Sequence, residues 1–80
     1  MAEVNVKQVL IDIAQAIVDN PDEVTVIQTE EEDNIYLELN VAPDDMGKVI
    51  GRHGRIAKAI RMIVKAAANS IGKKASVEIK

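Results

Sequence analysis

The sequence contains no cysteine and almost no aromatic side chains. The absence of cysteine excludes disulfides, a thiolate nucleophile and the common cysteine-rich zinc sites, and it fits a reducing compartment. Aromatic residues make up only 1% of the 80 residues, so the core must be filled by the aliphatic side chains that dominate the 48% of hydrophobic residues. This composition predicts short helices on a small sheet, stabilised by packing alone or by packing and self-association.

Long apolar runs are also missing. No segment approaches the roughly 20 apolar residues of a membrane span. The start, Met1-Ala2-Glu3-Val4-Asn5, lacks the basic region and apolar run of a signal peptide. We therefore expect a cytoplasmic protein with no membrane partner. Because a chain of 80 residues hides only about 60% of its unfolded surface, we expect one domain spanning residues 1–80.

The net charge of −3 conceals a division of charge along the chain. Residues 1–45 contain twelve Asp or Glu and one Lys, a net charge of −11. Residues 46–80 contain nine Lys or Arg and one Glu, a net charge of +8. Since exposed charges are screened beyond about 8 Å at physiological salt, a phosphate near the second segment would feel mainly its local field. A nucleic-acid site is therefore expected in the basic half.

The first half of the chain predicts one helix and a β-hairpin. Apolar residues recur at helical spacing over residues 5–19, where Asn5 and Gln8 can cap the start reciprocally. The β-branched run at residues 23–29 and the alternating run at residues 35–41 predict two strands. Because the segment between them is short, polar and acidic, we expect an antiparallel hairpin with that acidic segment as its turn.

The second half predicts two helices and a final strand. Asp44 or Asp45 can cap a short helix that runs through Ile50, and a longer helix follows from Arg55 to about Ile71. The last residues alternate apolar and polar side chains, as a strand does. The aliphatic residues expected on the buried face of the longer helix are Ile56, Ala59, Ile60, Ile63, Val64, Ala67 and Ile71.

The predicted fold class is α+β, with the element order α-β-β-α-α-β. A strand that leaves through two helices and returns to the same sheet normally lies parallel to where it began, by a right-handed crossover. We expect a three-stranded mixed sheet with residues 35–41 in the centre and three helices packed on one face.

Between the two later helices, Gly51 and Gly54 flank Arg52 and His53. Glycine lets this loop turn sharply and lets a sugar-phosphate backbone approach closely. Unpaired amides of residues 51–54 and the start of the following helix favour an anion, and Arg52 adds a forked donor for phosphate. On its own, Gly-x-x-Gly more often marks only a tight turn, so its context has to decide.

A row of cations supports the phosphate-binding interpretation. At about 100° per residue, Arg55, Lys58, Arg61 and Lys65 fall within an arc of roughly 120°, opposite the aliphatic stripe. Lys48 adds a charge near the loop. A charge run on a helix is most often a solvated face, but here it begins at the glycine loop. His53 has no second histidine or cysteine with which to share a metal, so we expect no cofactor.

Two isolated side chains have simpler interpretations. Tyr36, on the outer strand face, is expected to be a surface packing residue, since one aromatic cannot form a series of base stacks. Met46 and Met62 are expected to fill the core or an interface.

The segment from Lys48 to Arg61, Lys-Val-Ile-Gly-Arg-His-Gly-Arg-Ile-Ala-Lys-Ala-Ile-Arg, resembles the KH signature: Val-Ile-Gly-x-x-Gly followed by a helix with spaced aliphatic residues. The element order resembles the bacterial type II KH arrangement. Over nearly its whole length the chain is similar to small single-KH-domain RNA-binding proteins of the KhpA (YlqC) family. One departure is Ala57, where many KH domains carry a bulky aliphatic residue, so the groove width implied by the resemblance stays open.

The resemblance implies that the loop clamps the backbone of about four nucleotides of single-stranded RNA. It also implies a shallow aliphatic groove for the bases, with the edge of the central strand opposite. The RNA-binding residues expected from the loop, the groove and the nearby cations are Lys48, Val49, Ile50, Gly51, Arg52, His53, Gly54, Arg55, Ile56 and Lys58.

The resemblance further implies a homodimer, or a heterodimer with a larger KH protein of the KhpB (Jag/EloR) type, acting in post-transcriptional regulation. Two functions stay open: a non-catalytic RNA-binding module, and a protein-interaction domain, because the run Ala66-Ala67-Ala68 permits close helix approach. No enzyme is expected, since no carboxylate pair, cysteine or second histidine suggests an active site. Single-stranded DNA stays an alternative ligand, because no residue can be tied to a 2′-hydroxyl contact.

Overall fold

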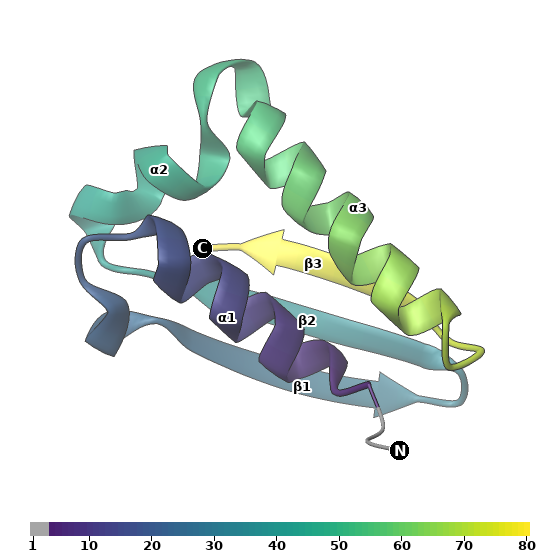
Figure 1. Ribbon diagram of the computed structural model, residues 1–80. Coiled ribbons are helices and arrows are strands. Elements are labelled where there is room, and N and C mark those ends of the chain that lie inside the picture. Colours follow the sequence, from purple (N-terminus) through teal and green to yellow (C-terminus); the bar gives the residue numbers. More distant parts are fainter. Residues whose placement is uncertain (1–3) are drawn as a thin grey trace.

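A computed structural model describes residues 4–80 (Figure 1). The helices are α1 (Val6–Ile17), α2 (Met46–Ile50) and α3 (Arg55–Asn69), and the strands are β1 (Thr25–Glu31), β2 (Asn34–Asn40) and β3 (Lys74–Ile79). Short 3-10 turns occupy Pro21–Glu23, Pro43–Asp45 and Arg52–Gly54. The predicted element order is confirmed. The expectation about the leader segment rests partly on residues 1–3, which lie outside the described residues.

The strands form one mixed sheet in the order β1-β2-β3. β1 pairs antiparallel with β2, and β2 pairs parallel with β3, so the central position of β2 is confirmed. The prediction that the whole acidic segment forms the turn is wrong, because Glu30 and Glu31 belong to β1 and pair with β2. Only Glu32 and Asp33 turn, with Glu32 at a φ of 55°. The backbone ladder extends into the acidic run because its exposed side chains need no burial there.

All three helices lie on the same face of the sheet (Figure 1). α1 and α3 cover the strands, and α2 packs against both helices at one end of the layer. None of the helices within residues 4–80 is both long and apolar enough to cross a bilayer. The buried core between helices and sheet consists of Val6, Leu10, Ala14, Val24, Val26, Ile35, Leu37, Leu39, Val49, Ile60, Val64, Ala68 and Ala75.

The buried face of α3 overlaps only in part with the one predicted, since Ile60 and Val64 are buried as expected. Its buried residues are Ala57, Ile60, Val64 and Ala68, which fall within an arc of about 80°. Ile56 and Ile63 are 39% and 49% exposed, and Ala59 and Ile71 are also exposed. The apolar surface of this helix is wider than its contact with the sheet, so periodicity alone placed the centre of the buried face incorrectly.

Only one of the two capping hydrogen bonds predicted at the start of α1 is found. The Oδ1 atom of Asn5 accepts a hydrogen bond from the backbone N–H of Gln8 at 3.0 Å. The reciprocal bond from Gln8 to Asn5 is absent among the described residues, because the Gln8 amide donates instead to Asp12 at 2.8 Å. One helix turn separates those two side chains, which makes them neighbours on the helix surface.

Asp45 joins the end of α1 to the start of α2. Its side chain makes no capping hydrogen bond to α2, so the predicted capping role is wrong. The fully buried carboxylate instead accepts the backbone N–H of Asp19 at 3.1 Å and the backbone and side-chain N–H groups of Asn20, both at 3.0 Å. Burial opposes ionisation of Asp45, but these three donors and the nearby charge of Lys48 together outweigh it, and the pKa of Asp45 is lowered. This contact fixes α2, which leads directly into the glycine loop.

Candidate nucleic-acid interface

Residues 51–54 form a sharp bend between α2 and α3, at the edge of the molecule farthest from the sheet (Figure 1). Three of the four residues have positive φ: Gly51 at 75°, His53 at 57° and Gly54 at 72°. Histidine is one of the few residues besides glycine that adopt this region readily. The loop is therefore built from residue types that fit its backbone.

Fewer loop amides are free than the sequence suggested. The N–H of Gly51 donates to the carbonyl of Gly47 at 2.9 Å, and that of Gly54 donates to the carbonyl of Gly51 at 3.2 Å. Within the described residues, no acceptor is found for the backbone N–H groups of Arg52 and His53. The prediction of four unpaired amides is wrong, and an anion would be held by two.

Gly51 is required for a second reason besides its dihedral angle. A Cβ atom added at Gly51 would lie 2.6 Å from Cγ1 and 2.9 Å from Cβ of Ile56. The Cβ of Ile56 is fixed by the backbone, so no rotamer change would relieve that contact. A Cβ added at Gly54, with almost the same φ, would meet no atom within 4 Å. Ile56 therefore packs against the loop and fixes the bend to the first turn of α3.

We expect Gly51→Ala to destabilise the protein more than Gly54→Ala. Gly54→Ala carries the cost of the left-handed helical region, about 1 kcal/mol. Gly51 combines a φ of 75° with a ψ of 174°, a conformation found almost only in glycine, so Gly51→Ala costs more in the backbone and adds the overlap with Ile56, for a total of about 2 kcal/mol or more. Chemical denaturation of the two variants measures the difference. Equal destabilisation would show that neither the backbone conformation of Gly51 nor its contact with Ile56 costs more than the left-handed backbone at Gly54.

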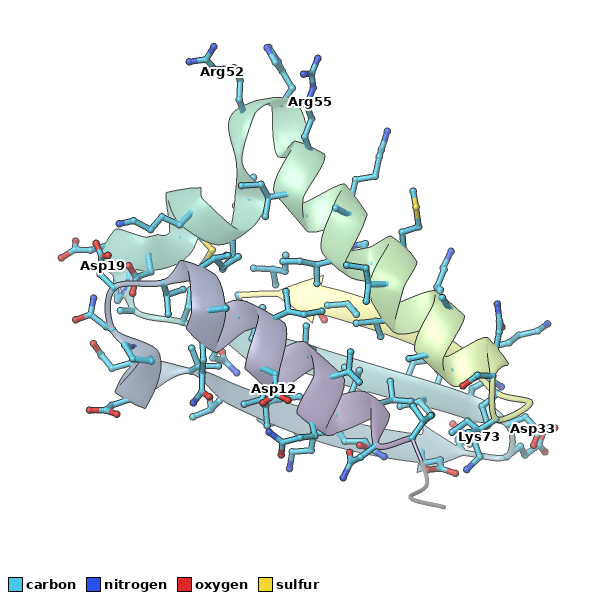
Figure 2. All side chains as sticks on the ribbon, in the orientation of Figure 1. Asp12, Asp19, Asp33, Arg52, Arg55 and Lys73 are labelled. Carbon is cyan, nitrogen blue, oxygen red and sulfur yellow. The ribbon has the colours of Figure 1, made fainter. Side chains whose placement is uncertain are left out.

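Arg52 and Arg55 extend outward from the bend, away from the body of the protein (Figure 2). Lys58, Arg61 and Lys65 continue this exposed row along α3. None of these five cations forms an ion pair within residues 4–80. The structure thus brings the expected cations Arg52, Arg55 and Lys58 together with the loop on one surface.

Lys48 does not join this group. Its Nζ atom lies 2.6 Å from Oδ2 of Asp19 and 3.6 Å from Oδ1 of Asp45, at the opposite end of α2 from the loop. The hydrogen bond to Asp19 raises the pKa of Lys48 above its usual value, despite partial desolvation. The two carboxylates compensate its charge, so the expected role of Lys48 in RNA binding is not supported.

The expected aliphatic groove is only partly available. Ile50 and Ile56 are each 39% exposed and flank the bend. Val49 is fully buried, so its predicted contact with bases is wrong. Ala57 is also buried, so its small side chain affects the packing of α3 and not the surface of a groove.

The strand edge beside α3 belongs to β3. The central strand β2 is paired on both sides, so the prediction that its edge faces the groove is wrong. β3 is an outer strand, and the Nε atom of Arg61 donates to the carbonyl of Val77 at 3.3 Å. Sequence analysis placed Arg61 in the cation row but could not detect this contact with a residue 16 positions away.

Comparison with known proteins places this geometry in context. A sequence profile described as "KhpA/KhpB, KH domain" matches residues 7–79. The chain is 59% identical over 73 residues to "RNA-binding protein KhpA" of Clostridium acetobutylicum. The matched segment covers 91% of this chain and 97% of that protein. It is 42% identical over 79 residues to the protein of the same name from Bacillus subtilis, covering 99% and 98% of the two chains. The similarity therefore includes the loop, α3 and all three strands.

Proposed function

This chain belongs to the KhpA/KhpB family of KH domains, and from that premise we propose that it binds single-stranded RNA through Gly51–Gly54 without catalysing a reaction. Relatives covering most of the chain are named RNA-binding proteins. The observation that carries the proposal is the convergence of two unpaired amides and two outward-pointing guanidinium groups at the bend. We further propose that residues 1–80 act as one domain in this role.

In this proposal the phosphates of the RNA bind at the loop and its bases lie beside the loop. The N–H groups of Arg52 and His53 and the side chains of Arg52 and Arg55 supply donors for about three phosphates of a bound tetranucleotide. Ile50 and Ile56 supply exposed aliphatic surface next to those donors. Aliphatic contact suits a domain that offers one exposed tyrosine and no aromatic series for base stacking.

Salt dependence tests this assignment. If about three phosphates are contacted, the affinity for a tetranucleotide should fall with salt along a log–log slope near −2, at roughly −0.7 per phosphate. Fluorescence anisotropy of labelled oligouridylate and of the matching deoxy oligonucleotide measures the slope and the preference for RNA. An affinity that does not change with salt would exclude the phosphate clamp, and tighter binding of the DNA would reassign the ligand.

A second candidate function is assembly. The exposed apolar residues on α3 share an arc of about 120°, where they form an apolar face bordering the cation row: Ile56, Ala59, Met62, Ile63 and Ala66. Met62 is 66% exposed, so its proposed role is at an interface and not in the core. The run Ala66-Ala67-Ala68 does not form one surface, because Ala68 is fully buried. We propose that this apolar face supports a homodimer, or a heterodimer with a KhpB-type partner.

Replacing Met62 and Ile63 with glutamine should weaken self-association at least about tenfold, because large apolar surface is removed without a change in charge. Light scattering after size exclusion, on nuclease-treated protein over a range of concentrations, measures the mass. The matched control is Ile27→Gln, which removes an exposed apolar side chain from the opposite face of the sheet. A monomeric wild-type protein at every concentration would exclude the homodimer.

A further inference from the structure

One buried polar cluster lies at the start of α2, apart from the loop. Its centre is Asp45, which is fully buried and is the only buried polar or charged residue within residues 4–80. A buried carboxylate is tolerated only where hydrogen bonds and opposite charge compensate it. The Asp45 cluster consists of Asp19, Asn20, Asp45 and Lys48. A shift of α2 relative to these groups therefore leaves a buried charge without its partners.

The Asp45 cluster holds the first turn of α2 at two points. Asp45 precedes the helix and accepts from the backbone N–H groups of Asp19 and Asn20 and from the Asn20 side chain. Lys48 lies one turn later, and its Nζ atom is 2.6 Å from Oδ2 of Asp19 and 3.6 Å from Oδ1 of Asp45. Both points thus contact the segment that follows α1. Two contacts one turn apart fix the direction of the short helix as well as its position.

α2 has few other features that could fix its orientation. It has five residues, far below the roughly 12 residues at which an isolated helix becomes even marginally stable in water. Gly47 lies inside it, and glycine is a poor helix former. Val49 is its only buried residue. The orientation of α2 therefore depends strongly on the packing of Val49 and on the Asp45 cluster.

The loop continues directly from the other end of α2. The N–H of Gly51 donates to the carbonyl of Gly47, so the bend is attached to the last turn of the helix. Figure 2 shows Asp19 at the opposite end of α2 from Arg52. Since five residues span about 7.5 Å, a tilt of about 15° at the start of α2 would move the loop by about 2 Å. That displacement exceeds the roughly 0.5 Å range of N–H···O distances, so the direction of the two unpaired loop amides depends on the Asp45 cluster.

We propose that Asp45 is a positioning residue for RNA binding: together with Asn20 and Lys48 it holds α2 in the orientation in which the loop presents its amides to phosphate. This inference rests on the proposed binding of single-stranded RNA at the loop. Lys48 then acts through Asp19 and Asp45 and makes no contact with the RNA. When the cluster is broken, the loop samples other orientations, and the apparent affinity falls in proportion to the fraction of molecules in the competent one. The bound state keeps the same phosphate contacts, so the salt slope should not change.

The first experiment measures tetranucleotide affinity and its salt slope by fluorescence anisotropy. It uses the full chain at a temperature where circular dichroism shows each variant folded. We expect Asp45→Asn to weaken binding about tenfold and Asn20→Ala about threefold, both with the wild-type slope. Asn20→Ala keeps the buried carboxylate and both backbone donors, so it tests the proposal even if Asp45→Asn does not fold. The matched control is Ile35→Ala, which destabilises the core at the hairpin end of β2 and should bind like wild type.

A second experiment separates positioning by Lys48 from direct contact with RNA, because the two roles predict opposite results. Asp19→Ala removes the carboxylate closest to Lys48 and leaves the lysine charge less compensated. If Lys48 positions α2, affinity should fall about threefold, whereas affinity should rise if Lys48 binds phosphate. Asp22→Ala is the control, because it makes the same charge change at an exposed position without an ion pair in the part of the chain that the structure describes.

Wild-type affinity in both Asp45→Asn and Asn20→Ala, or an equal loss in Ile35→Ala, would overturn the positioning role. A salt slope reduced by about 0.7 in these two variants would also overturn it, because a phosphate contact would then be lost. An affinity of Asp19→Ala equal to or above that of Asp22→Ala would overturn the role of the lysine. A wild-type protein that does not bind the tetranucleotide would instead reject the loop as the RNA site, so failure of the proposed function is distinguishable from failure of this inference.

Discussion

Replacing Arg52 and His53 together with aspartate should reduce affinity for a tetranucleotide by roughly 100-fold or more while the protein stays folded. The substitution removes one guanidinium and the imidazole and places two carboxylates where phosphates are expected, so attraction becomes repulsion. His53 has a φ of 57°, a conformation that aspartate also tolerates, so the backbone of the bend should be retained. Anisotropy titration measures the affinity, and circular dichroism with thermal unfolding measures the fold.

A control variant with the same change in net charge distinguishes a loss of binding at the loop from a general electrostatic effect. Lys7→Asp combined with Thr29→Asp changes the net charge by the same amount, on α1 and on the outer face of β1. If the site is the loop, this control should bind within about threefold of wild type, since distant exposed charges are largely screened. Full affinity in the Arg52/His53 variant would show that the bend does not hold the ligand.

The features that could be predicted from sequence are those encoded by neighbouring residues. The bend at Gly51 and Gly54 was recognisable because both positions need or tolerate positive φ, and glycine signals this directly. The strand order followed from two β-rich runs, a short turn and the right-handed crossover rule. Even so, the ladder extended into Glu30 and Glu31, because backbone pairing does not depend on side-chain polarity when those side chains face solvent.

The features that could not be predicted depend on contacts between distant parts of the chain. α3 carries apolar residues over more than half of its circumference, so its buried face is decided by where the sheet lies and not by periodicity. Lys48 looked like a loop cation, but its partner Asp19 is 29 positions away. Asp45 looked like a helix cap, but its partners are 25 and 26 positions away. In both cases the side chain is charged as expected, but the groups that it contacts differ from the predicted ones.

Asp45 is expected to be a position at which even a substitution of the same size strongly destabilises the protein. Its two carboxylate oxygens accept from donors on both sides: Asp19 on Oδ1 and Asn20 on Oδ2. In Asp45→Asn one oxygen becomes an NH2 group, which faces an N–H donor in either orientation of the amide. We therefore expect the melting temperature to fall by about 15 °C or more, since buried donors lose their acceptor. Asp44→Asn, an exposed neighbour with the same charge change, should shift it by less than about 3 °C.

The effect of Asp45→Asn should also depend on pH in a defined direction. The pKa of Asp45 is lowered in the folded protein, so its carboxylate contributes stability above the unfolded pKa of about 4 and loses it as pH falls through the folded value. The gap in melting temperature between wild type and Asp45→Asn should thus be constant at neutral pH and narrow below about pH 4. Glu38, whose pKa is lowered by Lys80 and Asn40, acts in the same direction but is present in both proteins and cancels. A gap that stays constant down to pH values where the fold is lost would show that the ionised carboxylate of Asp45 is not what joins α1 to α2.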